Sequence, residues 1–192
     1  LDDWDPTTGE PEITSSSKGV PERLSKMVHL VPMNDANRLE DLLKQKHNEI
    51  GALLIEPILG NCCSISADQD YVTSVRELCT KYDVVLIIDE VKTGFRVAKG
   101  GVQELYGIEA DLCTYAKSIA NGYPISALCG KEEMMRLIKY GGVLHGGTFT
   151  AHSVAISAAN KTLEIIESTD ALDTVCDYGL QLRKGLSKIL SD

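Results

Sequence analysis

The feature that most constrains the fold is a set of short, largely apolar segments that alternate with segments of helical periodicity. Four of them have the length of strands (Ala52–Ile55, Val84–Ile88, Asp111–Ala116 and Ile125–Cys129). Apolar runs that do not alternate with polar residues are typical of strands buried on both faces, as in parallel sheets. Strands that alternate with helices predict an α/β fold, with three layers α/β/α around a mostly parallel sheet.

Further elements follow from capping residues and spacing. We predict a short strand over Val28–Val31 and helices after the caps Asn34 and Asp68. Three more helices are predicted over Lys131–Tyr140, from about Ser153 to Glu167, and from Asp170 towards Leu190. The polar first residues, and a start at Leu1 rather than Met, predict a piece of a longer protein.

Charge and cysteine usage exclude several classes of function. The net charge of -9 argues against nucleic acid as a partner, because phosphate binding depends on clustered Lys and Arg. The longest apolar stretch, Val84–Ile88, is far too short to span a membrane. The six cysteines form no C-x-x-C pair, so we predict no metal site and interpret them as reduced, buried thiols of a cytoplasmic protein.

The strand ending at Asp89-Glu90 permits three interpretations. It could be the metal-binding strand of a nucleoside-triphosphate hydrolase. It could also end in an acid that pairs with the ring nitrogen of a cofactor, or in carboxylates that are simply solvated. The first requires a phosphate-binding loop, G-x-x-x-x-G-K-[ST]. The chain's Gly-Lys pair, Gly130-Lys131, is followed by Glu132 and has Ile125 where the first glycine belongs. The hydrolase interpretation is therefore disfavoured.

Lys117 follows Asp89 by 28 positions, after the next predicted strand. In α/β sheets, ligands bind at the carboxyl ends of the strands, where both residues are predicted to lie. A lysine at the end of a buried strand has a desolvation cost, unless it has a chemical role such as forming a Schiff base. The pair therefore favours a cofactor site over surface residues.

These residues and their neighbours resemble the class III aminotransferases, most closely the glutamate-1-semialdehyde 2,1-aminomutase branch. The resemblance runs from about Gly19 to Glu167 and rests on Leu86–Arg96, Gly100-Gly101, Ala110–Leu112, Lys117, Gly122–Pro124 and Gly130. Two stretches, Gly94–Gln103 and Ile55–Asn61, look most like the aminomutase branch. The resemblance implies the large domain of a fold-type I enzyme that uses pyridoxal 5'-phosphate.

The resemblance also implies a role for each site residue. Lys117 would bind the cofactor covalently and move protons, and Asp89 would hydrogen-bond the ring nitrogen. Val91 would pack on the ring face, and Asn61 would reach the ring hydroxyl. Thr148 would donate its hydroxyl to the phosphate of the partner subunit's cofactor, which implies a homodimer with shared active sites.

In domain terms, the resemblance makes residues 1–27 an irregular polar lead-in and residues 28–168 part of the cofactor-binding domain. Residues 169–192 would be a helix leading to a small C-terminal domain. That domain and the N-terminal part of the family fold would be largely missing from this chain.

The implied substrate is a small amino acid or amino aldehyde. The chain departs from relatives at Lys92, where one branch has Gln and another Met, and at Ile119–Asn121 and Ala151–Ser153. These positions adjoin the expected pocket and leave the substrate open. The alternatives are therefore a class III transaminase that transfers the amino group of an ω- or β-amino acid to a keto acid, and a non-catalytic relative.

Overall fold

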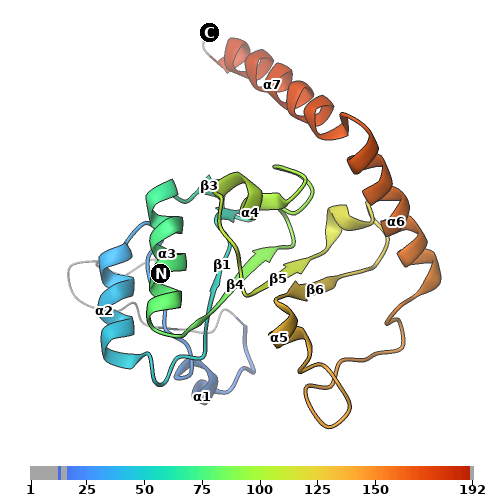
Figure 1. Cartoon of the computed structure of the whole chain (residues 1–192). Helices are drawn as coiled ribbons and strands as arrows, with labels where there is room; N and C mark the ends of the chain where they lie inside the picture. The colour runs from blue at the N-terminus through green and yellow to red at the C-terminus, as the bar shows by residue number, and fades with distance from the viewer. Residues whose placement is uncertain (1–12, 14–16, 191–192) are drawn as a thin grey trace.

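The structure is a computed structural model that describes residue 13 and residues 17–190 (Figure 1). Its main sheet has four strands in the order β1-β4-β5-β6. Strands β1 (Ala52–Ile55), β4 (Val85–Glu90) and β5 (Leu112–Tyr115) run parallel, and β6 (Ala127–Gly130) pairs antiparallel with β5. The predicted α/β fold with a mostly parallel sheet is confirmed.

Between β1 and β4 the chain forms a small antiparallel pair, β2 (Ile58–Leu59) with β3 (Ile65–Ser66). The helices are α1 (Glu22–Ser25), α2 (Ala36–Lys46), α3 (Gln69–Lys81), α4 (Gly101–Tyr106), α5 (Glu132–Met135), α6 (Ser153–Ser168) and α7 (Ala171–Leu190), with a 3-10 turn, η1, at Lys117–Ile119. Most connections are short, so chemically important residues at the strand ends stay close to the sheet.

The capping prediction for α2 is wrong by one residue. Asp35 is the N-cap, and its side chain accepts a hydrogen bond from the Arg38 amide. Asn34 instead has a left-handed backbone, and its Oδ1 accepts from the Asp68 amide at 2.9 Å. Asp68 is the N-cap of α3, as predicted, although its side chain makes no capping hydrogen bond. The Asn34 side chain therefore joins the starts of the two helices.

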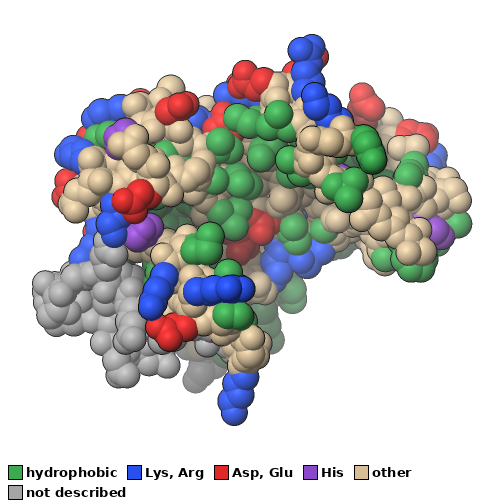
Figure 2. All heavy atoms as spheres, turned by 90° about the horizontal axis from the view of Figure 1, so that it is seen from below, with side chains coloured by type: hydrophobic (Ala, Val, Ile, Leu, Met, Phe, Trp, Pro, Cys, Tyr) green, Lys and Arg blue, Asp and Glu red, His purple; other side chains and the backbone are tan. Residues whose placement is uncertain are grey.

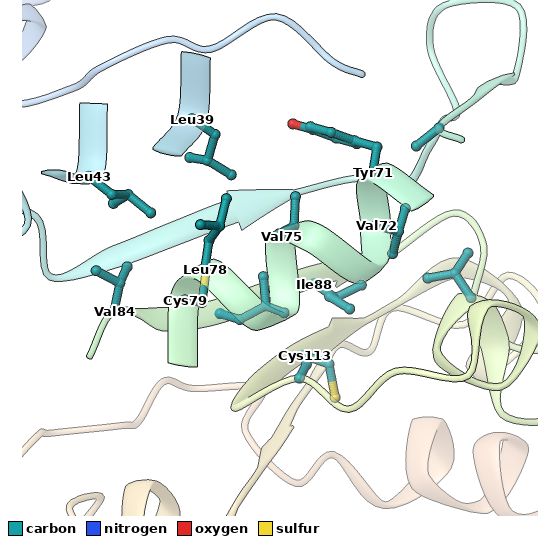
Figure 3. Close-up of a cluster of buried hydrophobic side chains, with 14 residues drawn as sticks. Leu39, Leu43, Tyr71, Val72, Val75, Leu78, Cys79, Val84, Ile88 and Cys113 are labelled. Atoms are coloured by element: carbon teal, nitrogen blue, oxygen red, sulfur yellow. The ribbon is translucent and has the colours of Figure 1, made fainter. Parts of the chain in front are cut away.

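The core lies between these two helices and one face of the sheet (Figure 3). Val72, Val75, Leu78 and Cys79 of α3 pack with Leu39 and Leu43 of α2, and with Leu86 and Ile88 of β4. All eight side chains are at most 9% exposed. Burial of this apolar area is the main favourable contribution to folding, at about 25 cal/mol per Å². This face of β4 also carries Glu90, which lies fully buried.

The opposite face of β4 is only half-buried, at Val85, Ile87 and Asp89. Within the described residues, the prediction of strands covered completely on both faces therefore does not hold. A second, smaller apolar cluster forms around Ile119, Ala120 and Ala159, and joins η1 to α6.

Two predicted elements differ from the structure. Val28–Val31 forms no strand, and the predicted helix Lys131–Tyr140 is confined to Glu132–Met135. The final helix begins at Ala171 as expected, but none of its residues is buried, and it projects away from the sheet (Figure 1). Of the predicted lead-in, residues 1–12 and 14–16 lie outside the described residues, and the described part contains α1.

Apolar side chains lie open among charged ones on the face seen in Figure 2. Highly exposed apolar residues include Tyr140, Leu144 and Phe149 in the segment between α5 and α6, and Leu190 at the end of α7. Within residues 17–190, no helix combines the length and apolar character needed to cross a membrane.

The cysteines are all free, but the prediction that they are buried is correct only for Cys79 and Cys113. Burial raises the pKa of the Cys79 thiol to about 11. The other four, including the adjacent Cys62 and Cys63 in the turn between β2 and β3, are exposed.

Candidate active site at the carboxyl ends of the parallel strands

Asp89 and Lys117 lie at the same edge of the sheet. Asp89 is the fifth residue of β4 and pairs with Thr114 of the neighbouring parallel strand β5. Lys117 follows the end of β5 by two residues and starts the turn η1. The strand order and direction therefore bring these two residues to the carboxyl ends of adjacent strands, where α/β sheets bind ligands.

The backbone at Lys117 is unusual. Its φ is +49°, in the left-handed region that residues with a side chain rarely adopt. Such conformations cost about 1–3 kcal/mol and concentrate at functional sites. Ser118 supports the turn by donating to the Gly94 carbonyl at 2.9 Å.

Lys117 does not carry the predicted desolvation cost, because its side chain is exposed in this chain. The left-handed turn carries the side chain beyond the half-buried end of β5. The geometric part of the prediction, a lysine at the end of the strand next to Asp89, does not depend on that burial.

The half-buried Asp89 carboxylate is held in place on one side only. Its Oδ1 accepts from the Val91 amide at 2.8 Å and from the Thr114 hydroxyl at 3.3 Å. Among the described residues both of its hydrogen bonds go to Oδ1, so Oδ2 is available to an additional donor. This arrangement fixes a carboxylate whose second oxygen can accept from a ligand.

A hollow of about 530 Å³ opens beside Lys117. It is lined by Ile58, Gly60, Ser64, Ser66, Lys92, Thr93, Arg96, Val97 and Lys117. Three of these residues are basic, two carry serine hydroxyls and none of them is acidic, although the chain as a whole has a net charge of -9. A lining of this composition favours an anionic ligand. A smaller hollow near the start of α3, lined by Asn34 and Asp68 among others, contains none of the predicted site residues.

The sequence analysis missed the role of Glu90, which fixes the turn after β4. Its Oε1 accepts from the Val102 amide at 2.8 Å and the Gln103 amide at 3.3 Å, and its Oε2 accepts from the Thr93 hydroxyl at 2.6 Å. The fully buried carboxylate thus joins β4 to the start of α4. The sequence signal for this contact was an acid and a threonine three positions apart, followed by the glycine pair Gly100-Gly101.

Close packing between this turn and β5 requires a glycine at position 94. A Cβ atom there would lie 2.6 Å from Cδ1 of Tyr115 and 2.8 Å from the Glu90 carbonyl oxygen. Phe95 stacks on Tyr115 with ring centroids 5.2 Å apart. Burial raises the pKa of Tyr115, so its hydroxyl stays protonated, and it accepts from Gln103 Nε2. The turn carrying Lys92 and Arg96 is therefore held rigidly against β5.

Asn61 and Val91 lie next to this hollow. Asn61 is exposed in the turn after β2, and its Oδ1 accepts from Lys92 Nζ. Val91 is half-buried and contributes its backbone amide to Asp89. The sequence analysis treated Lys92 only as a departure from relatives, whereas the structure places it in the lining of the hollow.

Thr148 is not brought to the hollow. It is exposed in the segment between α5 and α6 and is not among the residues that line the hollow. Of the five predicted site residues, four lie in or next to one edge of the sheet, and Thr148 is separate from them.

The structure gives the rival phosphate-loop interpretation no support. Lys131 Nζ forms an ion pair with Asp111 Oδ1 at 2.6 Å, and Arg76 binds Asp111 Oδ2 at 2.9 Å. The Gly130-Lys131 pair therefore belongs to an ion cluster at the amino end of β5. Among residues 17–190, no group of three His, Cys, Asp or Glu side chains is arranged to hold a metal ion.

Comparison with known proteins places this geometry among aminotransferases. Residues 10–192 match the family model described as aminotransferase class-III. The chain is 39% identical over 187 residues to the glutamate-1-semialdehyde 2,1-aminomutase of Methanothrix thermoacetophila, a match covering 97% of this chain and 42% of that protein. This chain thus spans about two fifths of the length of its curated relative.

Solved structures show the same fold. An omega-transaminase from Sphaerobacter thermophilus superposes with a TM-score of 0.84 at 32% identity, over 92% of this chain and 41% of that one. A transaminase with bound PLP superposes with a TM-score of 0.86 at 27% identity, over 94% of this chain and 43% of the other.

Proposed function

The chain belongs to the class-III aminotransferase family, and from that premise we propose that its protein relocates an amino group as a glutamate-1-semialdehyde 2,1-aminomutase does. The cofactor is pyridoxal 5'-phosphate. The observation that carries the proposal is the placement of Asp89 and Lys117 at the carboxyl ends of adjacent parallel strands, with Lys117 in a left-handed turn that lines a basic hollow.

The residues present fit this cofactor. Pyridoxal phosphate needs an amine to hold its aldehyde carbon, an acid for its ring nitrogen and a basic environment for its anionic groups. Lys117 supplies the amine, Oδ2 of Asp89 supplies the acceptor, and the lining of Lys92, Arg96 and Lys117 supplies positive charge. Ser64 and Ser66 add hydroxyl donors.

Each residue has a defined task in this proposal. When bound, the cofactor withdraws the electron pair left on the substrate carbon as a proton departs. Nζ of Lys117 would hold the cofactor and would take up and return the proton at the substrate carbon. Oδ2 of Asp89 would accept from the ring nitrogen and favour its protonated form. Val91 would pack against the ring, and the Asn61 amide would hydrogen-bond the ring oxygen.

Rigidity is the contribution of the surrounding fold. Glu90, Gly94 and Ser118 fix the turn that follows Asp89 and the turn that carries Lys117, through the hydrogen bonds and close packing described above. A site held this way keeps its reactive groups in one geometry. Reactive groups that are already oriented lower the barrier of a reaction.

For the substrate, we favour glutamate-1-semialdehyde. The curated relative is named for the isomerisation of that compound, and it matches almost all of this chain. The alternative is a transaminase of an ω- or β-amino acid with a keto-acid acceptor. It is supported by the likeness to an omega-transaminase and by the departures at Lys92, Asn121 and His152.

Mass balance separates the two candidates. Full-length enzyme is incubated with glutamate-1-semialdehyde, and 5-aminolevulinate is assayed in the absence of any keto acid. An aminomutase forms the isomer without an acceptor. Strict dependence on pyruvate or 2-oxoglutarate, with ω- or β-amino acids as donors and no 5-aminolevulinate formed, would establish the transaminase alternative instead.

The proposed assembly is a homodimer with shared sites. Thr148 does not line its own chain's hollow, and the segment that carries it also carries the exposed Phe149, Leu144 and Tyr140. An exposed segment with apolar side chains and a hydroxyl donor suits a contact with a second copy. We propose that Thr148 serves the cofactor phosphate of the partner subunit.

The remaining organisation is also a proposal. Residues 28–168 would be part of the cofactor-binding domain, and α7, which buries none of its side chains, would lead to a second domain. The compartment would be the cytoplasm, since six free cysteines, four of them exposed, suit a reducing environment.

A further inference from the structure

Lys92 is unusual among the residues of the hollow because its side chain contacts a different loop. It follows Val91 in the turn after β4 and is half-buried. Its Nζ donates to the Gly60 carbonyl at 3.0 Å and to Oδ1 of Asn61. A charged group at the edge of the site therefore bridges two loops that are about 30 positions apart in sequence.

The turn at Gly60 is fixed from two directions. The Gly60 amide donates to Oε2 of Glu56 at 3.3 Å, and its carbonyl accepts from Lys92. The Lys92 side chain passes so close to the Gly60 Cα that a Cβ atom there would collide with its Cδ. The glycine and the lysine thus fit each other, and a larger residue at position 60 would displace the lysine.

The chemistry of the two groups fixes the orientation of the Asn61 amide. An ammonium group has three donors and no acceptor, whereas an amide has an oxygen that accepts and a nitrogen that donates. The side of Asn61 that faces Lys92 must therefore be its oxygen. The Asn61 amide nitrogen is consequently the end left to donate to a ligand.

We propose that Lys92 is a positioning residue that holds the 60–61 turn and orients Asn61, so that the Asn61 nitrogen donates to the ionised ring oxygen of the cofactor. This inference rests on the proposed function and adds to it the means by which Asn61 is aimed.

Several charges surround this contact. Lys117 and Arg96 line the same hollow as Lys92, Glu56 is bound to the Gly60 amide, and Asp89 ends the strand that precedes the turn. Substitution of Lys92 removes both its hydrogen bonds and its positive charge. The test must therefore separate the effect of the lost hydrogen bonds from the effect of the lost charge.

The readout is the pH midpoint of the visible absorbance of the full-length holoenzyme, which reports the proton on the nitrogen that joins Lys117 to the cofactor. Lys92→Met deletes donor and charge, Lys92→Gln keeps a donor without the charge, and Lys92→Arg keeps both. Each is measured alone, and Lys92→Met is also measured with Asn61→Ala. Lys99→Met is the matched control, because Lys99 Nζ binds the Glu167 carbonyl and does not line the hollow.

Loss of an oriented donor to the ring oxygen stabilises the protonated form. Lys92→Met is therefore expected to raise the midpoint by roughly one pH unit. Lys92→Arg and Lys99→Met are expected to match the wild type, and Lys92→Gln to lie nearer the wild type than Lys92→Met. In the Asn61→Ala background, Lys92→Met is expected to cause no further shift, since residues that act through one contact are not additive.

Two results would overturn the inference. One is an unchanged midpoint in both Lys92→Met and Lys92→Gln. The other is an equal Lys92→Met shift with and without Asn61, which would mean that the charge acts alone. If Lys92→Met does not fold, the same comparison is made with Lys92→Gln, with and without Asn61. A wild-type protein that shows no cofactor-dependent absorbance at all would instead refute the proposed function.

Discussion

Removal of the Glu90 carboxylate should loosen the turn that carries the site. In Glu90→Ala, three donors lose their acceptor: the Val102 amide, the Gln103 amide and the Thr93 hydroxyl. Val102 is 0% exposed and Thr93 is 5% exposed, so water cannot replace the carboxylate without disruption. Each buried unsatisfied donor costs about 1–3 kcal/mol, which gives about 4 kcal/mol for these two groups together.

Glu90→Gln should be far milder. The amide oxygen can still accept from Val102 and Gln103, and the amide nitrogen can donate to Thr93, whose hydroxyl also accepts. The expected cost is about 1 kcal/mol, the net value of one hydrogen bond. A second comparison is Glu104→Ala on the same helix, whose exposed carboxylate accepts, within the described part of the chain, only from the Gly100 amide.

Amide hydrogen exchange of the full-length protein measures these effects locally. If the Val102 amide exchanges by local opening, 4 kcal/mol corresponds to an increase of about a thousandfold in Glu90→Ala. Glu90→Gln and Glu104→Ala should each change the rate by less than about tenfold. Equal protection of Val102 in Glu90→Ala and the wild type would refute the view that this carboxylate fixes the turn.

Other predictions concern the site, the assembly and stability. Asp89→Asn keeps the bonds from Val91 and Thr114 but places an NH2 group where Oδ2 was, so turnover should fall about a hundredfold or more with cofactor still bound; near-normal turnover would remove Asp89 from the catalytic residues. Mixing full-length Lys117→Ala and Thr148→Ala proteins should restore activity, because one site of each heterodimer is intact at both positions; heterodimers that stay inactive would place both residues in one chain's site. At Asp111, burial opposes the charged form, but hydrogen bonds from Lys131, the Leu86 amide and Arg76 outweigh it and lower the pKa below its usual 3.8. The stabilisation by the Asp111 carboxylate is therefore present above pH 3.8 and is lost as pH falls through the lowered pKa. Asp111→Asn should lower the free energy of unfolding by about 1–3 kcal/mol at pH 7, and the difference in melting temperature between this variant and the wild type should disappear in acid. A difference in melting temperature that is independent of pH would contradict this.

The sequence predicted the strands better than their ends. The apolar run Val84–Ile88 located β4, but the strand extends to Glu90, because the buried carboxylate is satisfied by backbone amides of α4. Those amides are 12 and 13 positions away, so the apolar run by itself does not reveal them. Val28–Val31 has the composition of a strand, yet it forms none, because a strand also needs a neighbour with which to pair.

The site was predictable where it depends on topology. Asp89 and Lys117 follow adjacent parallel strands, so their placement at one edge came from the order of the elements. The exposure of Lys117 and the contact between Lys92 and Asn61 were not predictable, since they arise from a left-handed turn and from packing between loops distant in sequence. Thr148 does not line the hollow, and a single chain gives no geometry for the partner subunit's site to which we assign it by proposal.

The central claim is that Lys117 holds the cofactor, and one measurement tests it most directly. Full-length holoenzyme is reduced with borohydride, digested, and the peptide that carries the reduced cofactor is sequenced by mass spectrometry. The account predicts a single modified lysine, Lys117. Modification of Lys92, which lines the same hollow, or of Lys99 or Lys131 in its place would contradict it.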